Sequence, residues 1–216
     1  MVYIEPRRSK YKIMITKNDY IKNLVSDAFR VPIFDVQTTV NTQSLIDYAY
    51  ELKNESKGRV ISNVSGWQSS DLDIKLPVFD ELKNTINKFA QDLHEYIDLK
   101  KDRLNILDNL WFNINSKGSS NRPHTHPGSV FSGVFYLKVP KNSGRIVFTN
   151  PNKLNEYHFD KDRVNSFNDY TSSYRWYEPK QSKLIMFPAN LEHYVEGHTA
   201  DEDRISIAFN TKLDNE

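Results

Sequence analysis

The chain has 216 residues and a formal net charge of +1, from 29 basic and 28 acidic side chains. This balance gives no reason to expect nucleic acid, a membrane surface or a strongly charged partner. The sequence contains no cysteine, which excludes disulfides, thiolate catalysis and cysteine-ligated metal sites. The length and the aromatic fraction of 12% suit a single globular domain.

The N-terminal residues are polar and mixed, and we expect them to form an arm or an edge element. They contain no apolar segment of the kind that a signal peptide needs. No segment approaches the roughly 20 apolar residues that cross a bilayer. We therefore expect a cytoplasmic protein with no membrane partner.

Two helices are predicted in the first half of the chain. Residues 30–40 are rich in β-branched and aromatic residues and predict a strand, after which Asn41 and Thr42 can cap a helix. A longer helix should follow Pro77, because apolar residues recur there at steps of three and four. Its apolar stripe, which we expect to pack on the back of a sheet, comprises Phe79, Leu82, Ile86, Phe89, Leu93 and Tyr96.

From residue 104 onward, short alternating runs of apolar residues are separated by Gly, Pro, Asn and Ser. Such runs predict antiparallel strands in a sandwich or barrel. They span residues 107–115, 129–139, 144–150, 182–188, 192–198 and 204–210. The expected class is α+β in one domain over 1–216, with an arm and supporting helices over 1–100 and a β core over 104–213.

Residues 151–178 form a long segment that is unusually aromatic. Long loops inside a compact domain are often functional. This segment could be a lid over a substrate, a small satellite core or the surface of a homodimer. Its aromatic residues are Tyr157, Phe159, Phe167, Tyr170, Tyr174, Trp176 and Tyr177.

The strongest chemical signal is the pair His124 and His126. In an extended chain, side chains two residues apart lie on the same side, so both imidazoles can reach one metal ion. Pro123 and Pro127 flank the pair and restrict its backbone. Neutral imidazole suits iron, zinc, copper and nickel. His193 is the candidate third ligand, from a distant strand.

Arg204 opens the last predicted strand and shares one face of it with Ser206. The other face is apolar and belongs against the helices, so this polar face should look into the barrel. There a guanidinium can bind a carboxylate through two parallel hydrogen bonds, and a bound dicarboxylate would offset its burial. The alternative is a surface arginine paired with Asp201 or Glu202.

Taken together, these segments resemble the 2-oxoglutarate/Fe(II) oxygenases, and specifically a phage and bacterial branch of that family. The resemblance rests on Val31–Phe34, Ser62–Ser69, His126–Gly144, Phe187–Glu196 and Asp203–Asn210, which are specific only in combination. It implies a double-stranded β-helix, that is, a jelly-roll or cupin-like barrel. It also implies a dioxygenase, of hydroxylase type, that uses Fe(II) with 2-oxoglutarate as co-substrate. A phage origin would place the protein in the host cytoplasm.

The resemblance also implies roles for individual residues. His124, His126 and His193 would hold the metal, although the wider superfamily usually has a carboxylate where His126 stands. Arg204 and Ser206 would bind 2-oxoglutarate. Tyr136 resembles the tyrosine that often hydrogen-bonds this co-substrate, and ordinary core packing is its alternative.

Several polar residues are weaker candidates. Asn113 and Asn115 share a face of their strand and either line the pocket or meet solvent. We assign Asn115 to the cofactor site and Asn113 to the substrate. Trp67 and Gln68 either contact substrate or clamp the barrel rim. The remaining histidines, His94, His158 and His198, are not expected to bind metal.

Two classes of function remain open from the sequence. The first is the oxygenase, acting on a small molecule or a protein side chain that the sequence does not identify. The second is a cupin-like metal-binding protein with non-oxygenase chemistry or a structural metal. Fe(II) and 2-oxoglutarate are the expected cofactors of the first class only.

Overall fold

Residues 29–152 and 159–214 of the chain are described by a computed structural model. The predictions for the N-terminal arm, Tyr157 and His158 lie outside the described residues. The described residues from Pro32 onward form one unit by their contacts. The expectation of a single domain over the whole chain stays a prediction.

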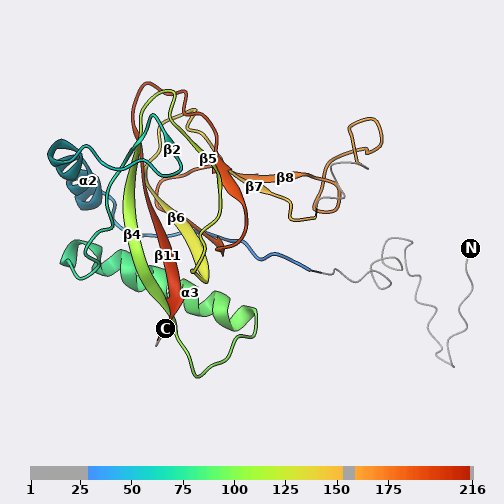
Figure 1. Cartoon of the computed structure of the whole chain (residues 1–216), viewed down its shortest axis with the longest axis horizontal. Coiled ribbons are helices and arrows are strands. Elements are labelled where there is room, and N and C mark those ends of the chain that lie inside the picture. The colour runs from blue at the N-terminus through green and yellow to red at the C-terminus, as the bar shows by residue number, and fades with distance from the viewer. Residues whose placement is uncertain (1–28, 153–158, 215–216) are drawn as a thin grey trace, which may run out of the picture. The chain divides into compact units, whose positions relative to one another are not determined.

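Two antiparallel β-sheets stack face to face (Figure 1). The first sheet has the order β1 (Phe34–Gln37), β9 (Lys183–Pro188), β6 (Phe131–Lys138), β11 (Arg204–Leu213), β4 (Asn105–Asn115) and β3 (Trp67–Gln68). The second has the order β2 (Asn63–Val64), β5 (Ser120–His124), β10 (His193–Val195), β7 (Ile146–Thr149) and β8 (Tyr174–Tyr177). Strands distant in sequence alternate within each sheet, so the predicted double-stranded β-helix is confirmed.

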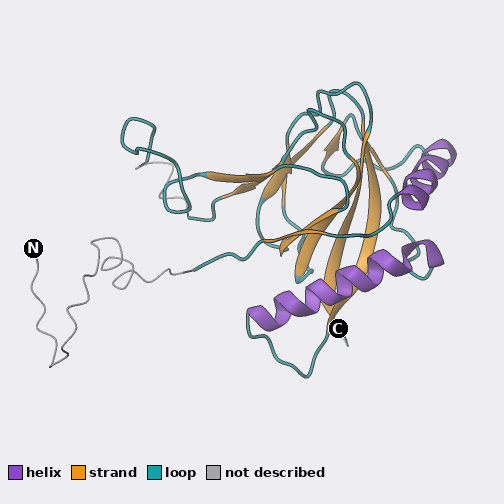
Figure 2. Ribbon diagram, turned by 180° about the vertical axis from the view of Figure 1, so that it is seen from behind, coloured by secondary structure: helices purple, strands orange, loops and turns teal. Residues whose placement is uncertain are grey.

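The two predicted helices are α2 (Gln43–Glu55) and α3 (Asp80–Tyr96), the latter preceded by a 3-10 turn at Pro77–Phe79. Both pack their apolar residues on the outer face of the first sheet (Figure 2). Thr42 is the N-cap residue of α2 but its side chain forms no capping hydrogen bond, whereas the side-chain oxygen of Asn41 accepts the N–H of Gln43 at 3.0 Å. None of the described helices is long and apolar enough to cross a membrane.

The stripe predicted along α3 is correct except at its end. Ile86 is fully buried, but the buried face continues through Ala90 and His94, four residues apart. Tyr96 is 76% exposed, so its assignment to the stripe is wrong. The steps of four keep the buried face in line with the sheet, whereas a final step of three turns Tyr96 away from it.

The alternation predicted for the last strand is confirmed. The face of β11 that packs against the helices carries three fully buried residues, Ile205, Ile207 and Phe209. Arg204 and Ser206 point to the opposite face, which looks toward the second sheet. The helices therefore close one side of the first sheet and leave its other side for the site.

Three short strands, β2, β3 and β8, were not predicted, and β5 was expected only as an extended chain around His124 and His126. Strand β5 reads Ser-Asn-Arg-Pro-His and carries no apolar alternation. It is a strand because its neighbours β2 and β10 supply backbone partners on both sides. Such pairing is a tertiary effect that local sequence does not reveal.

Gly133 of β6 provides a test of this packing. A Cβ at this position would meet the ring of Phe209 and lie 2.6 Å from the carbonyl oxygen of Ile185. Gly133→Ala should therefore lower the free energy of unfolding by about 1–3 kcal/mol, as overpacking does. The measurement is urea unfolding followed by circular dichroism.

Gly197→Ala is the matched control, because nothing lies within 4 Å of the added carbon. Its free energy of unfolding should stay within about 0.5 kcal/mol of the wild-type value. Equal stabilities for both variants would contradict the packing described for β6.

Candidate active site

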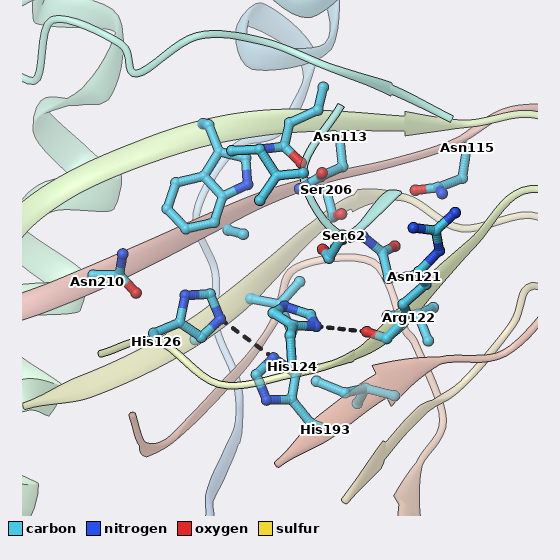
Figure 3. A pocket seen from close by; sticks show the side chains of 18 of the residues that line it. Ser62, Asn113, Asn115, Asn121, Arg122, His124, His126, His193, Ser206 and Asn210 are labelled. Atoms are coloured by element: carbon cyan, nitrogen blue, oxygen red, sulfur yellow. Dashed lines mark hydrogen bonds between the residues drawn. The ribbon is translucent and has the colours of Figure 1, made fainter. Parts of the chain in front are cut away.

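A cavity of about 460 Å³ lies between the two sheets (Figure 3). Its lining comes from β4, β6 and β11 on one side and from β5 and β10 on the other. The three imidazoles lie on the second-sheet side, with Asn121 and Arg122, and Arg204 lies on the first-sheet side. A volume of this size suits a small ligand.

Three histidines converge in this cavity. The antiparallel pairing of β10 with β5 sets His193 directly opposite His124. His126 follows the end of β5, and its backbone N–H donates to the carbonyl of Ala189 at 2.8 Å. One ring nitrogen from each histidine lies within 4.8 Å of the other two, which brings them within reach of one metal ion.

The strand alternation expected to align His124 and His126 holds only in part. His124 is the last residue of β5, so the strand alternation does not extend to His126. A turn at Pro127–Gly128, with Gly128 at φ 86°, follows instead, and the bond to Ala189 holds the backbone of His126 in place. The two rings still approach each other, with centroids 5.1 Å apart.

Backbone carbonyls select the tautomers of two of these rings. His124 Nδ1 lies 2.7 Å from the carbonyl oxygen of Arg122, and His193 Nδ1 lies 2.9 Å from that of Leu191. A carbonyl oxygen only accepts, so each Nδ1 carries the hydrogen and each Nε2 keeps a free lone pair. Histidine ligands of metals are commonly oriented by such a bond.

The Nε2 atoms of His126 and His193 are only 3.3 Å apart, and the two rings are nearly parallel, at 10°. Two nitrogen lone pairs at this distance repel each other unless a proton or a cation lies between them. Two imidazole nitrogens bound to one ion at about 2.1 Å, at right angles, would lie about 3.0 Å apart. The observed spacing is therefore compatible with a shared ion.

The site keeps its imidazoles neutral. Burial, followed by the proximity of His124, lowers the pKa of His193 to about 3 and that of His126 to about 4. Burial also lowers the pKa of His124. Phe187 contributes to this burial, since its ring centroid lies 4.6 Å from that of His193. Neutral imidazole is the form that binds metal.

Arg204 lies on the first sheet and is 2% exposed. Its Nη1 donates to the carbonyl of Gly144 at 2.7 Å and its Nη2 to Oδ1 of Asn115 at 2.9 Å. Its Nε is buried without a hydrogen-bond partner, and burial lowers its pKa. Neutral acceptors alone leave a buried guanidinium uncompensated, which favours a bound anion.

The alternative ion pairs for Arg204 do not form. Asp201 pairs with Lys117 at 2.7 Å, and Glu202 pairs with Lys138 at 3.2 Å. Both acidic residues therefore have lysine partners at the surface. No described carboxylate pairs with Arg204.

Comparison with known proteins agrees with this chemistry. Residues 109–210, just under half of the chain, match the family model described as "Putative 2OG-Fe(II) oxygenase". This part of the chain therefore resembles the 2OG-Fe(II) oxygenases. The matched residues include all three histidines and Arg204, and Fe(II) and 2-oxoglutarate are the cofactors of this family. A search of curated proteins finds no match to the sequence.

Solved structures share the fold at low sequence identity. A prolyl-4-hydroxylase from Pseudomonas putida is 14% identical with a TM-score of 0.57, covering 83% of this chain and 91% of the other. A viral collagen prolyl hydroxylase from Paramecium Bursaria Chlorella virus-1 is 13% identical with a TM-score of 0.55, covering 83% and 94%. The epimerase SnoN from nogalamycin biosynthesis is 13% identical with a TM-score of 0.63, covering 85% and 78%.

The register of the first sheet arranges the side chains that line the cavity in rows. Arg204 lies beside Asn115, and two residues further along β11, Ser206 lies between Asn113 of β4 and Tyr136 of β6. Gln68 of β3 extends this second row, because it pairs with Asn113. The structure therefore brings together six of the predicted polar residues, all of which line the cavity.

Tyr136 fits both of its proposed roles. Burial raises its pKa to about 12, while the nearby charge of Arg204 acts in the opposite direction. Its ring packs in a buried cluster with Phe148 and Phe187. The same side chain therefore belongs to the core and lines the cavity beside Arg204.

Trp67 is not brought into the cavity. Its indole N–H donates to the carbonyl of Ser56 at 2.9 Å, and its ring packs against the main hydrophobic core. The adjacent residue Gln68 faces the cavity instead, because neighbouring side chains of a strand point to opposite faces. The geometry of Trp67 is that of the rim clamp.

Sequence reasoning missed several lining residues, among them Trp111, Arg59 and Asp71. Trp111 could have been found, since it shares the face of β4 that carries Asn113; its ring centroid lies 5.9 Å from that of His126. Arg59 and Asp71 form an ion pair, and the guanidinium lies 5.8 Å over the Trp111 ring. No local signal placed this pair at the cavity.

The aromatic segment does not form a buried satellite core in its described part. Tyr170 is 63% exposed, Phe167 54% and Trp176 51%. Only its β8 portion is held in a sheet, by pairing with β7. The roles of lid and dimer surface stay predictions.

The neutral imidazoles predict an acid-sensitive fold. A histidine with a pKa near 6.5 in the unfolded chain and near 3 or 4 in the folded one takes up protons only on unfolding. The free energy of unfolding of metal-free protein should therefore fall as the pH drops from about 7 to 5. Denaturant titrations at the two pH values, with a chelator present, measure this slope.

His193→Asn and His126→Asn should each make that pH dependence shallower. Asparagine removes the titrating group and keeps a polar side chain of smaller size. A slope that is unchanged in both variants would show that these imidazoles are not held neutral by the fold.

Proposed function

We propose that this oxygenase holds Fe(II) between His124, His126 and His193 and hydroxylates a small-molecule or protein side-chain substrate. The observation that carries the proposal is the approach of three neutral imidazoles, two of them with Nε2 freed by a backbone acceptor. Imidazole is a good ligand for iron, and three such ligands leave coordination positions for other molecules. When bound, the iron and 2-oxoglutarate supply the oxidising chemistry, with succinate and CO₂ as co-products.

Arg204 is the proposed partner of the distal carboxylate of 2-oxoglutarate. Its charge has no described carboxylate partner, and its Nε lacks an acceptor. Asn115 would orient the guanidinium rather than contact the co-substrate, because its oxygen already accepts from Nη2. Ser206 and Tyr136, in the adjacent row, are positioned to donate hydroxyl hydrogen bonds to the same molecule.

The structural relatives suggest two kinds of substrate. Two of the relatives named above are prolyl hydroxylases, and SnoN is an epimerase of nogalamycin biosynthesis. A prolyl residue and a small natural product both suit a cavity of this size. A phage origin, a cytoplasmic location and a homodimer remain part of the proposal.

A structural metal is the second candidate function, and the ligand count disfavours it. Structural zinc sites in proteins usually have four protein ligands. Among the described residues, only His124, His126 and His193 form a group of three or more side chains able to hold an ion. This open set is typical of a site that binds a further molecule at the metal.

Arg204→Ala tests the proposed co-substrate site. The variant should bind 2-oxoglutarate more weakly by at least about 2 kcal/mol, or roughly 30-fold, because a charged pair of hydrogen bonds is lost. Anaerobic titration calorimetry of the iron-loaded protein measures the affinity.

Arg175→Ala is the control for that titration, since Arg175 is exposed, pairs with Asp169 and does not line the cavity. It should bind as the wild type does. Wild-type affinity in the Arg204 variant would remove this residue from the co-substrate site.

The assignment of His126 can be tested by replacing it with the carboxylate usual in the superfamily. His126→Ala should lose iron and iron-dependent succinate formation. His126→Asp should retain both to a large part, because an aspartate at this position would complete a two-histidine, one-carboxylate site. Iron content and succinate are measured on the purified variants.

Thr125→Ala is the control, as Thr125 lies between the two histidines and is exposed. It should leave the iron content unchanged. Full iron content in His126→Ala would mean that His126 is not a ligand.

A further inference from the structure

The charged residues that line the cavity are predominantly cationic. Among the described residues they are Arg59, Arg122, Arg204 and a single acid, Asp71. Asp71 is already paired with Arg59 and also accepts from Asn109 at 3.1 Å. The three imidazoles are neutral and add no negative charge. Among the described residues, no other carboxylate lines the cavity to balance the buried Arg204 and the exposed Arg122.

A divalent ion and 2-oxoglutarate would not change this balance. The two negative charges of the co-substrate offset the two positive charges of the ion, since all three proposed ligands are neutral. In the usual superfamily site, a carboxylate ligand lowers the net charge of the occupied site by one further unit. With His126 in that position, the occupied site keeps the charges of Arg122 and Arg204 and attracts a further anion.

Arg122 is the cation that this anion can reach. It lies on β5 two residues before His124, and Figure 3 shows both side chains at the same pocket. Its backbone is fixed, because its N–H donates to the carbonyl of Ser62 at 2.9 Å and its carbonyl accepts from His124. Among the described residues its guanidinium has no hydrogen-bond or ion-pair partner. Arg204, in contrast, is committed to the co-substrate.

Two amides that line the same cavity from the first sheet are also without partners. Gln68 and Asn113 pair across β3 and β4 and both line the cavity. Neither side-chain amide forms a hydrogen bond with another described residue. They can therefore donate to and accept from a polar ligand near the metal. The remaining cavity volume must also hold 2-oxoglutarate, which limits the bound part of the substrate to a small group.

We propose that the substrate of this oxygenase is a small anion whose carboxylate or phosphate group binds the guanidinium of Arg122. Arginine suits either group, because its planar fork forms two parallel hydrogen bonds with both. Gln68 and Asn113 bind the polar atoms next to the reacting carbon. That the bound anion is a substrate rests on the proposed function. The anion site itself rests on Arg122 alone.

Matched probe pairs test this site in the full chain loaded with Zn(II) and 2-oxoglutarate, which occupy the metal and Arg204 without turnover. Glycerol 3-phosphate is compared with glycerol, and N-acetylglycine with N-acetylglycinamide. The readout is the arginine Nε–H signals in ¹⁵N-resolved NMR spectra, assigned with single-arginine variants. Each charged probe that binds should shift the Arg122 signal, and its neutral counterpart should not.

Arg122→Gln should weaken binding of the preferred charged probe at least about tenfold, as for one lost charged contact. Arg163→Gln is the matched control, since Arg163 is 62% exposed and does not line the cavity. It should bind the probe as wild type does. The better of the two charged probes identifies phosphate or carboxylate as the recognised group.

The proposal is overturned if neither charged probe binds better than its neutral counterpart, or if Arg122→Gln binds the charged probes as tightly as wild type. The same titration is repeated on metal-free protein. A shift of the Arg122 signal there, together with failure to bind iron or 2-oxoglutarate, would reject the proposed function and retain the anion site.

Discussion

The site depends on the antiparallel pairing of β5 with β10, which sets His193 opposite His124. Between His193 and Val195 the register shifts, so that Asn121 and His124, three residues apart, both face partners on β10. Such a bulge changes the direction of side chains without breaking the sheet. It brings Asn121, Arg122 and His124 of one short strand to the same cavity. His126 then enters from the following turn.

Burial acts on both sides of this cavity, with opposite consequences. On the second sheet it keeps His193 and His126 neutral, as metal binding requires. On the first sheet it leaves the charge of Arg204 without a described counter-ion, which favours a dicarboxylate. The two halves are complementary, because a molecule with one carboxylate at Arg204 can extend its other end toward the imidazoles across the cavity.

The sequence was sufficient to predict side-chain direction where one face of a strand packs on the helices. The alternation in β11 separated Ile205 and Ile207 from Arg204 and Ser206, and the structure keeps that division. It was insufficient for β5, whose strand character comes from its neighbours, and for Arg59 and Asp71, which reach the cavity through tertiary contacts. Local sequence patterns indicate which face of a helix or strand is buried. They do not indicate which polar loops meet in the folded protein.

The most direct test of the account is a crystal structure of the protein soaked anaerobically with Fe(II) and 2-oxoglutarate. The account predicts one iron bound by Nε2 of His124, His126 and His193, with the distal carboxylate of 2-oxoglutarate on the guanidinium of Arg204. An iron that lacks His193, or a co-substrate carboxylate held away from Arg204, would contradict it.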